Sequence, residues 1–386
     1  DADTAEAIDF LDFYGLEMLR YAAPQPFTPV PGEKNALTYI PLGVGLSIPP
    51  WNFPMAILCG MTSAAWIAGN AVVLKPASIT PMMGWLYMEI VREAGLPDGV
   101  VNFLSGPGGQ VGNTLVQHPR TRFICFTGSK EVGLEINKEA ATHRPGQIWI
   151  KRVVAEMGGK DSIIVDRETD LDKAVEGVTL SAFGFQGQKC SACSRAIVDA
   201  AVYDAFVEKL AKRVAKITQG DPTDPANYMG PVSEKAAFDS IMRYIDIGKK
   251  DGRLLCGGQG DASTGFFIQP TVIVDVPPKA VISQEEIFGP VLAVIKAKDW
   301  KDALQIANNT EFGLTGAVYT DDPEKQKEAL AEFHVGNLYI NRKCTGALVG
   351  GHPFGGFNMS GTDSKAGGRD YMLLFLQAKS TAVKVG

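Results

Sequence analysis

Short runs of β-branched and apolar residues alternate with helical segments from Pro41 onward, and this alternation limits the possible folds more than any other feature of the sequence. The first half of the chain carries predicted strands at 44–48, 71–75, 100–104 and 122–126 and predicted helices at 54–68, 81–94, 110–117 and 129–141. After about Val153 the alternation resumes, with strands at 162–165 and 194–198 and helices at 171–183 and 202–217. Strands joined through helices run parallel, so the pattern predicts doubly wound α/β sheets.

The order of these segments predicts two domains and an arm. A chain of 386 residues exceeds the size at which one hydrophobic core stops growing. An amphipathic first helix, with Asp3 and Thr4 placed to cap it, precedes a Pro-rich stretch and an alternating run that resembles a hairpin. The alternating tail is expected to pair with that hairpin. We therefore predict one α/β domain from residues 1–21 and 39–155, a second from residues 156–375, and an interlocking arm from residues 22–38 and 376–386.

Charge and cysteine content exclude several classes of function. The net charge is −6 and basic residues form no block, so neither nucleic acid nor a membrane surface is an expected partner. No apolar stretch is long enough to span a bilayer and no signal peptide opens the sequence, so we expect a cytoplasmic protein, or a mitochondrial matrix protein in a eukaryote. The six cysteines lack a disulfide framework and are expected to be reduced. Cys190-x-x-Cys193 looks like a redox or zinc pair, but no second pair or nearby histidine accompanies it, so no metal is predicted.

Three local patterns carry side chains suited to acyl chemistry. Cys190 follows Lys189 in a glycine-bearing loop after a helix, which favours a thiol of low pKa, although a buried filler cysteine is the alternative. Glu156 precedes a double glycine and is expected to be exposed on a turn, either as a general base or as a solvated carboxylate. Asn52 lies between two prolines at the carboxyl end of a strand, where a rigid amide donor suits an oxyanion.

Two further patterns suit a nucleotide cofactor. The run from Gly106 to Gly112 lacks the spacing of a dinucleotide fingerprint. Lys75, however, ends a buried strand, where its ammonium is able to meet a ribose or a phosphate. The segment Phe126–Gly133 ends a strand and opens a helix, whose free amides and positive dipole end suit a pyrophosphate.

Seven motifs in this order, PWNFP, KPAS, FTGS, EMGGKD, GQKC, EEIFGP and PFGG, resemble the aldehyde dehydrogenase family. The resemblance covers essentially the whole chain. It implies an aldehyde dehydrogenase-like α/β fold of two doubly wound domains, one for NAD(P) and one catalytic, plus an oligomerisation β-arm. It also implies Cys190 as nucleophile, Glu156 as general base and Asn52 as oxyanion donor.

The same resemblance implies NAD as cofactor, with Lys75 at the adenosine ribose, Ser129 at the pyrophosphate, and Glu286 and Phe288 at the nicotinamide end. The full set implied for the cofactor is Pro50, Trp51, Lys75, Ser78, Gly128, Ser129, Gly133, Glu286 and Phe288. Ser78 stands where many members of the family carry a glutamate that disfavours a 2′-phosphate, so tolerance of NADP stays open. The resemblance further implies that the family's usual N-terminal portion, part of the cofactor domain, is not included in this sequence.

Within the family, the finer resemblance is to the branch that oxidises L-glutamate γ-semialdehyde, the second step of proline catabolism. It rests on GQKCSA and on the run from Asn341 to Tyr371, with TGALVG, PFGG, SGT and KAGG in register. It implies a substrate site of Ser191, Gly346 and Ala347 at the substrate carboxylate, Phe53 and Phe354 on its aliphatic chain, and Lys189 nearby. An amino-acid aldehyde needs such donors, which amides and a hydroxyl provide.

Three alternatives stay open. The first is a dehydrogenase for another semialdehyde such as succinate semialdehyde. The second is an acylating enzyme that passes the thioester to coenzyme A, and the third is a non-catalytic member of the fold. The expected partners are a small-molecule substrate and further copies of the chain, as a homodimer or a higher oligomer of dimers.

Overall fold

The computed structural model describes residues 1–385, which form two compact units. Unit 1 contains Asp1–Met157, Ala347–Gly355 and the chain from Gly361 onward. Unit 2 contains Gly158–Gly346 and Gly356–Ser360. The predicted boundary at 155/156 is therefore close to the observed one, but the C-terminal segments return to unit 1.

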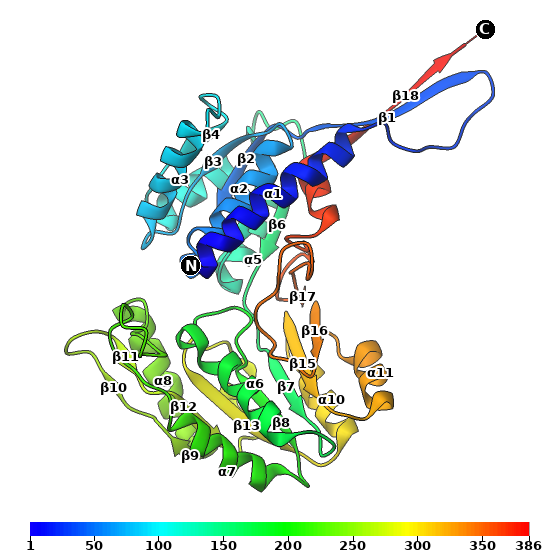
Figure 1. Cartoon of the computed structure of the whole chain (residues 1–386). Helices are drawn as coiled ribbons and strands as arrows, with labels where there is room; N and C mark the ends of the chain where they lie inside the picture. Colours follow the sequence, from blue (N-terminus) through cyan, green and yellow to red (C-terminus); the bar gives the residue numbers. More distant parts are fainter. Residues whose placement is uncertain (386) are drawn as a thin grey trace. The chain divides into compact units, whose positions relative to one another are not determined.

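Unit 1 is built on a parallel sheet of five strands in the order β4-β3-β2-β5-β6. Its strands are β2 (Val44–Ile48), β3 (Ala71–Leu74), β4 (Val101–Phe103), β5 (Thr121–Thr127) and β6 (Arg152–Glu156). The connecting helices are α2 (Ala56–Ile67), α3 (Pro81–Glu93), α4 (Asn113–Gln117), which continues the π-helix η1 (Gly108–Gly112), and α5 (Lys130–Ala141). The chain adds β3 and β4 on one side of β2 and then β5 and β6 on the other, so this unit is doubly wound (Figure 1).

The first helix, α1 (Ala2–Ala22), packs against α2. Asp3 does not cap α1 as predicted, because Asp1 occupies the N-cap position. The Asp3 carboxylate instead accepts hydrogen bonds from the backbone N–H groups of Met55, at 3.0 Å, and Ala56, at 2.9 Å, at the start of α2. A carboxylate at a helix N-terminus satisfies amides that have no partner within the helix.

Aromatic contacts explain why the C-terminal residues join unit 1 rather than the predicted domain 156–375. The 3₁₀-helix η3 (Arg369–Phe375) places Tyr371 on Tyr14 of α1, with ring centroids 5.5 Å apart, and Phe375 on Phe123 of β5, also at 5.5 Å. These rings are buried. Such long-range burial leaves no trace in local periodicity, so the sequence pattern did not reveal it.

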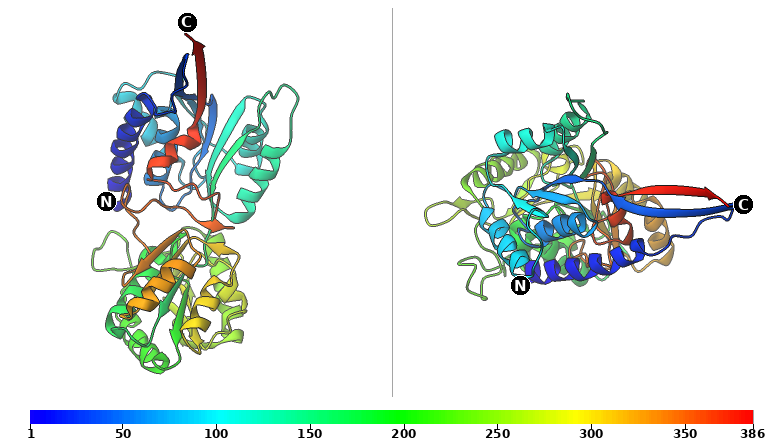
Figure 2. Two further views of the ribbon diagram at one scale, coloured as in Figure 1. Left: turned by 90° about the vertical axis from the view of Figure 1, so that its right-hand side faces the viewer. Right: turned by 90° about the horizontal axis from the view of Figure 1, so that it is seen from above.

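The predicted arm is present as a two-stranded antiparallel ribbon. Strand β1 (Glu33–Pro41) pairs with β18 (Leu376–Lys384) from Glu33 opposite Lys384 to Pro41 opposite Leu376. Figure 2 shows these blue and red strands running side by side away from the other elements of unit 1. The pairing of the early hairpin segment with the tail is therefore confirmed.

Unit 2 is built on a seven-stranded sheet in the order β16-β15-β7-β8-β13-β12-β9, parallel except for β9 at one edge. Its strands are β7 (Ser162–Val165), β8 (Arg195–Asp199), β9 (Arg253–Cys256), β12 (Thr271–Val274), β13 (Val291–Ala297), β15 (Thr315–Tyr319) and β16 (Asn337–Ile340). Its main helices are α6 (Leu171–Phe183), α7 (Tyr203–Val214), α8 (Lys235–Asp251), α10 (Trp300–Asn308) and α11 (Pro323–Glu332). Short elements complete it: α9 (Val281–Gln284), the pair β10 (Gly260–Asp261) and β11 (Phe267–Ile268), and the pair β14 (Phe312–Gly313) and β17 (Phe357–Asn358).

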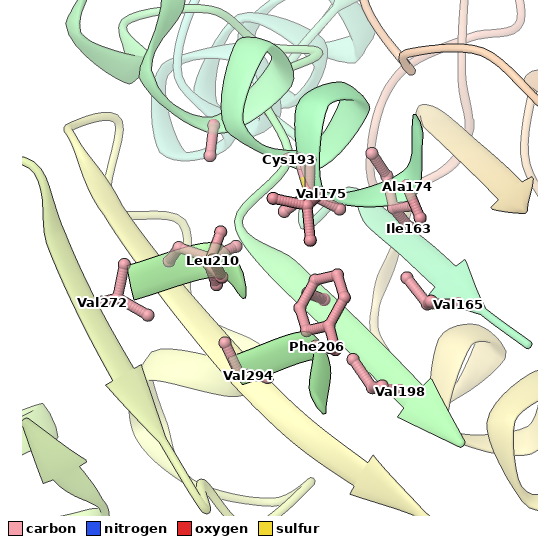
Figure 3. Close-up of a cluster of buried hydrophobic side chains, with 14 of the residues drawn as sticks. Ile163, Val165, Ala174, Val175, Cys193, Val198, Phe206, Leu210, Val272 and Val294 are labelled. Carbon is pink, nitrogen blue, oxygen red and sulfur yellow. The ribbon is translucent and has the colours of Figure 1, made fainter. Parts of the chain in front are cut away.

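Helices cover both faces of this sheet, so its central strands are buried on both sides. On one face, Phe206 and Leu210 of α7 lie over Val198 and Val294 (Figure 3). A second apolar cluster on the other face includes Ile241 of α8 and other residues of α8 and α10. Strands covered on both faces read as continuous apolar runs rather than alternating ones, as β7 and β13 do.

Strand β6 was not predicted. Residues 143–151 before it form no regular helix, and the strand has one charged residue at each end, Arg152 and Glu156, so its apolar run is only three residues long.

In the part of the chain that the structure describes, no helix is long and apolar enough to cross a membrane.

The close packing of β2 against β5 generates a stability prediction. A Cβ atom on Gly45 of β2 would lie 2.0 to 2.6 Å from three atoms of the Phe123 ring. Gly45→Ala is expected to lower the stability of the protein by about 1–3 kcal/mol, because an overfilled core forces side chains off their rotamers. Calorimetry should show a lowered thermal midpoint.

The matched control is Gly15→Ala in α1, where nothing lies within 4 Å of the added Cβ. Alanine has the higher helix propensity, so this variant should melt at the same temperature as the unmodified protein or above it. Equal melting of Gly45→Ala and the unmodified protein would contradict the packing argument.

Candidate active site

The Cys190 loop follows α6 in unit 2, as predicted. The helix ends at Phe183, and Phe185 and Gln186 then adopt left-handed backbone angles, with φ of 56° and 57°, within the turn Gly184–Gly187. Cys190 is partly exposed, whereas Cys193, three residues on, is buried. The chain thus leaves a helix through a strained turn and presents one accessible thiol.

Glycines let three separate motifs meet around this loop. A Cβ atom on Gly158 would lie 2.0 Å from the Glu286 carboxylate, and one on Gly159 would lie 2.7 Å from the Cys190 carbonyl oxygen. Similarly, a Cβ on Gly187 would lie 2.3 Å from the Gly289 carbonyl oxygen. EMGGKD, GQKC and EEIFGP therefore pack at distances that only glycine permits.

Glu286 is fixed by the same arrangement. One of its carboxylate oxygens accepts a hydrogen bond from the Gly159 N–H at 3.0 Å. Phe288, two residues on, has a positive φ of 57°, which is rare for an aromatic residue. Both residues were predicted near the nicotinamide, and the structure brings their segment to the Cys190 loop through Gly158 and Gly159.

The loop that carries Gly346 also reaches the Cys190 loop. The Ser191 carbonyl oxygen accepts from the Cys344 thiol at 3.3 Å and from the Thr315 hydroxyl at 3.4 Å. Arg342 donates to the carbonyl oxygens of Thr345, at 3.1 Å, and Gly346, at 3.0 Å. Two of the predicted substrate residues, Ser191 and Gly346, thus lie on segments joined through Cys344.

Arg195 is a residue of this region that the sequence patterns did not single out. Its buried guanidinium donates to the carbonyl oxygens of Lys160, at 3.0 Å, Ile306, at 3.2 Å, and Ala307, at 3.0 Å. Asp161 beside it accepts from the Thr315 N–H at 2.7 Å, and burial raises the pKa of this carboxyl well above its usual range. The EMGGKD segment is therefore clamped by buried polar contacts as well as by glycine packing.

Glu156 is positioned in unit 1 and corrects one prediction. It is the last residue of β6, opposite Thr127 of β5, and is only 8% exposed rather than standing on an open turn. Its carbonyl oxygen accepts from the Gly128 N–H at 3.1 Å. Burial raises the pKa of its carboxyl to about 8, Lys365 opposes this shift, and Glu6 adds to it. A carboxyl with such a pKa can exchange a proton near neutral pH.

Asn52 lies at the same edge of the unit 1 sheet. The loop with Pro50, Trp51 and Phe53 follows β2, and Asn52 within it is 6% exposed. Lys75 follows β3 and Ser129 follows β5. Because the strands are parallel, their carboxyl ends share one edge, and the order of strands reverses between β2 and β5, where open α/β sheets bind ligands.

The predicted cofactor residues of unit 1 have environments suited to phosphate groups. The Ser129 hydroxyl accepts from the Val132 N–H at 3.4 Å and caps α5. The backbone is closely packed at Gly128, where a Cβ would lie 2.5 Å from the Phe126 ring, and at Gly133, where it would lie 2.4 Å from the Met157 sulfur. The start of α5 therefore packs closely on the sheet and presents amides for an anion.

Lys75 and Ser78 flank the end of β3. Lys75 is buried, its ammonium donates to the Pro76 carbonyl oxygen at 3.1 Å, and burial lowers its pKa. The Ser78 hydroxyl, which is more exposed, donates to the Gly106 carbonyl oxygen at 3.4 Å. A buried cation followed by a neutral hydroxyl is compatible with a ribose.

The remaining predicted residues, Ala347 and Phe354, lie in a C-terminal portion of unit 1. Phe354 forms an antiparallel bridge with Ala366, with hydrogen bonds of 2.8 and 2.7 Å. The residue just before Ala366 is Lys365, to which the sequence patterns assigned no role.

Among residues 1–385, no group of three or more histidine, cysteine, aspartate or glutamate side chains is arranged to hold a metal ion.

Known proteins resemble this chain over nearly its whole length. The model described as the aldehyde dehydrogenase family matches residues 1–381. A Geobacillus thermodenitrificans protein named 1-pyrroline-5-carboxylate dehydrogenase is 58% identical over 382 residues, which cover 99% of this chain and 74% of that protein. An Anoxybacillus flavithermus protein of the same name is 57% identical with the same coverage.

Solved structures agree with this match. A Thermus 1-pyrroline-5-carboxylate dehydrogenase with bound NAD superposes with a TM-score of 0.97 at 52% identity, over 99% of this chain and 74% of that one. The proline utilization A protein of Bdellovibrio bacteriovorus superposes with a TM-score of 0.97 at 48% identity, over 100% of this chain and 40% of that one. The chain belongs to the aldehyde dehydrogenase family.

Proposed function

We propose that this protein oxidises L-glutamate γ-semialdehyde, the open form of 1-pyrroline-5-carboxylate, to L-glutamate with NAD⁺, the second step of proline catabolism. The observation that carries the proposal is the joining of the Cys190 loop, the Glu286 segment and the Gly346 loop within unit 2. Relatives at 58% and 57% identity bear the name of this dehydrogenase, and a relative with 52% identity binds NAD.

In the proposed cycle, the Cys190 thiolate attacks the aldehyde carbon and forms a carbon–sulfur bond. The Asn52 amide and the Cys190 N–H stabilise the resulting oxyanion. NAD⁺, when bound, supplies the acceptor for the hydride that leaves this carbon, which turns the adduct on Cys190 into a thioester. Glu156 then takes a proton from water, the hydroxide adds to the thioester, and the thiolate leaves with release of the acid.

The residues of this chain fit the cofactor. The capped N-terminus of α5 at Ser129 presents amides for a pyrophosphate, and the glycines at 128 and 133 keep that terminus close to the sheet. Lys75 and Ser78 suit the adenosine ribose, while Pro50 and Trp51 line the neighbouring loop. Glu286, held by the Gly159 N–H, suits the nicotinamide ribose. A neutral Ser78 repels no 2′-phosphate, so tolerance of NADP is part of the proposal.

The substrate anchor is proposed on the Gly346 loop. Gly346 adopts φ of 79°, a left-handed conformation, while Arg342 binds the carbonyl oxygens of residues 345 and 346. With these carbonyls engaged, the amides of Gly346 and Ala347 and the Ser191 hydroxyl suit a carboxylate. Phe53 and Phe354 provide apolar surface for the aliphatic chain, and Lys189 adds positive charge next to Cys190.

We also propose that the protein is a homo-oligomer in the cytoplasm. The β1–β18 ribbon is mostly exposed along both strands, and an isolated two-stranded ribbon leaves both of its edges open to pairing. Another copy of the chain is the partner that such an edge suits. The six cysteines, all within the described residues, form no disulfide, which favours a reducing compartment.

The first test compares substrates. NADH formation from pyrroline-5-carboxylate should exceed that from succinate semialdehyde and from simple aliphatic aldehydes by at least about tenfold in kcat/KM, because the anchor binds the amino-acid carboxylate. A parallel series with coenzyme A distinguishes hydrolysis from acyl transfer. Equal rates with aliphatic aldehydes would leave the Cys190 chemistry in place and remove the anchor.

A second test separates the nucleophile from the base. Cys190→Ala should form no NADH while still binding NAD⁺ in a fluorescence titration. Glu156→Gln should release about one equivalent of NADH in a burst and then turn over about 10²–10⁴ times more slowly, since the thioester persists. In the unmodified protein, hydrolysis should slow as the pH falls through about 8, because the protonated Glu156 accepts no proton. Steady turnover by Cys190→Ala would exclude the assignment.

A third test addresses the double glycine. Gly158→Ala places a methyl group on the Glu286 carboxylate and should break its hydrogen bond to Gly159. The KM for NAD⁺ is expected to rise by about tenfold or more, the effect of losing a charge-assisted hydrogen bond. Gly109→Ala, where nothing lies within 4 Å of the new Cβ, is the control. An unchanged KM in Gly158→Ala would argue against a cofactor role for Glu286.

A further inference from the structure

Lys365 has a backbone conformation that does not suit its residue type. Its φ is 47°, in the left-handed region that glycine and asparagine usually occupy. The Phe354–Ala366 bridge fixes the chain on one side, and a Cβ on Gly355 would lie only 2.8 Å from the Lys365 nitrogen. Glycine would relieve this strain at position 365. A strained residue in a well-packed turn points to a use for its side chain.

The Lys365 ammonium is held in place rather than extended into solvent. It donates to the Gly355 carbonyl oxygen at 2.7 Å and lies 3.3 Å from a carboxylate oxygen of Asp363. Its side chain is 30% exposed. The positive charge therefore has a defined position beside the turn.

The segment before Lys365 is fastened to the end of β6. Thr362 donates its N–H to the Ala155 carbonyl oxygen at 2.9 Å, and its hydroxyl accepts from the Ala155 N–H at 3.0 Å. Gly361 forms an antiparallel bridge with Glu156, and a Cβ there would lie 3.2 Å from the Glu156 Cα. The loop that carries Lys365 thus lies directly against the residue proposed as general base.

The other ionisable groups near Glu156 are acidic or neutral at pH 7. Glu6 and Tyr14 face it from α1, Cys125 from β5 and Tyr371 from η3. Glu6 adds to the rise in the pKa of Glu156, and the buried hydroxyls and thiol have pKa values raised above their usual range. Among the groups that act on Glu156, Lys365 is the one that opposes this rise.

We propose that the Lys365 ammonium keeps the buried Glu156 carboxylate in its ionised, proton-accepting form and so sets the pH range in which the thioester on Cys190 is hydrolysed. This role rests on the proposed function of Glu156. Lys365 is a positioning residue in this proposal, because it acts through the carboxylate and takes part in no bond change.

The experiment measures thioester hydrolysis in single turnovers of the full chain against pH, with pyrroline-5-carboxylate and NAD⁺. Lys365→Met and Lys365→Gly should move the acid limb of the hydrolysis profile upward by about one pH unit, the lower end of the effect of a nearby opposite charge. At a fixed pH well below the limb, hydrolysis should be about tenfold slower. Lys365→Arg should restore the limb, and the NADH burst from Cys190 acylation should stay the same in all three variants.

Two controls separate charge from structure. Lys365→Gly suits the left-handed backbone, so its thermal midpoint should not fall, and a shifted limb in this variant cannot come from unfolding. Lys327→Met, at an exposed position of α11 in unit 2, removes the same charge elsewhere and should leave the limb unmoved.

Three results would overturn the proposal. The first is an acid limb that stays in place in both Lys365→Met and Lys365→Gly. The second is a rate of hydrolysis that falls by the same factor at every pH, which would indicate a structural effect. The third is a limb that Lys365→Arg shifts as far as Lys365→Met does. Absence of an NADH burst in the unmodified protein is a separate outcome, because it removes the proposed function itself and with it the role of Lys365.

Discussion

The backbone at Gly158 and Gly159 runs against the Glu286 carboxylate and the Cys190 carbonyl oxygen, and most of the unit 2 site depends on this approach. A side chain at either position would separate the nucleophile loop from the segment proposed to hold the nicotinamide. The same two residues begin unit 2 immediately after Glu156 and Met157 end the first segment of unit 1. Close packing of this main chain on the Glu286 carboxylate and on the Cys190 carbonyl oxygen therefore sets the geometry, and hydrogen bonds such as that from the Gly159 N–H to Glu286 hold it.

Burial of ionisable groups is the second theme of the site. Glu156, Lys160 and Asp161 stand within six residues of one another and all are buried, and burial lowers the pKa of Lys160 to about 7. Because the pKa of Glu156 is raised from 4.5 to about 8 in the folded state, its contribution to stability is complete below pH 4.5 and is lost as the pH rises from there through about 8. Burial of Glu156 thus lowers the stability of the fold at neutral pH, but it shields the carboxylate from water and makes it a stronger base than a solvated carboxylate.

Local patterns predicted the regular elements well and the long-range contacts poorly. The strands at 44–48 and 162–165 and the helix at 171–183 match the structure, because each has a clear apolar period and clear breakers. The burial of Glu156 was missed, since it depends on pairing of β6 with β5 and on cover from residues near 361. The role of Arg195 was missed for the same reason, because its carbonyl partners lie on two segments far from it in sequence, Lys160 on one and Ile306 and Ala307 of α10 on the other. The ordered set of motifs indicated the family, whereas single motifs did not.

The discontinuity of unit 1 has a consequence for how the protein is made. Apart from residues 356–360, unit 2 is complete once Gly346 has been synthesised, and its seven sheet strands all lie before that point. Unit 1 combines the first segment of the chain with its C-terminal segments. For example, the Tyr14 hydroxyl accepts a hydrogen bond from the Gly367 N–H, 353 positions away in the sequence. Contacts so distant in sequence form late, because closing the intervening loop costs entropy. On the ribosome, the nucleophile loop is therefore able to form before Glu156 receives the neighbours that bury it.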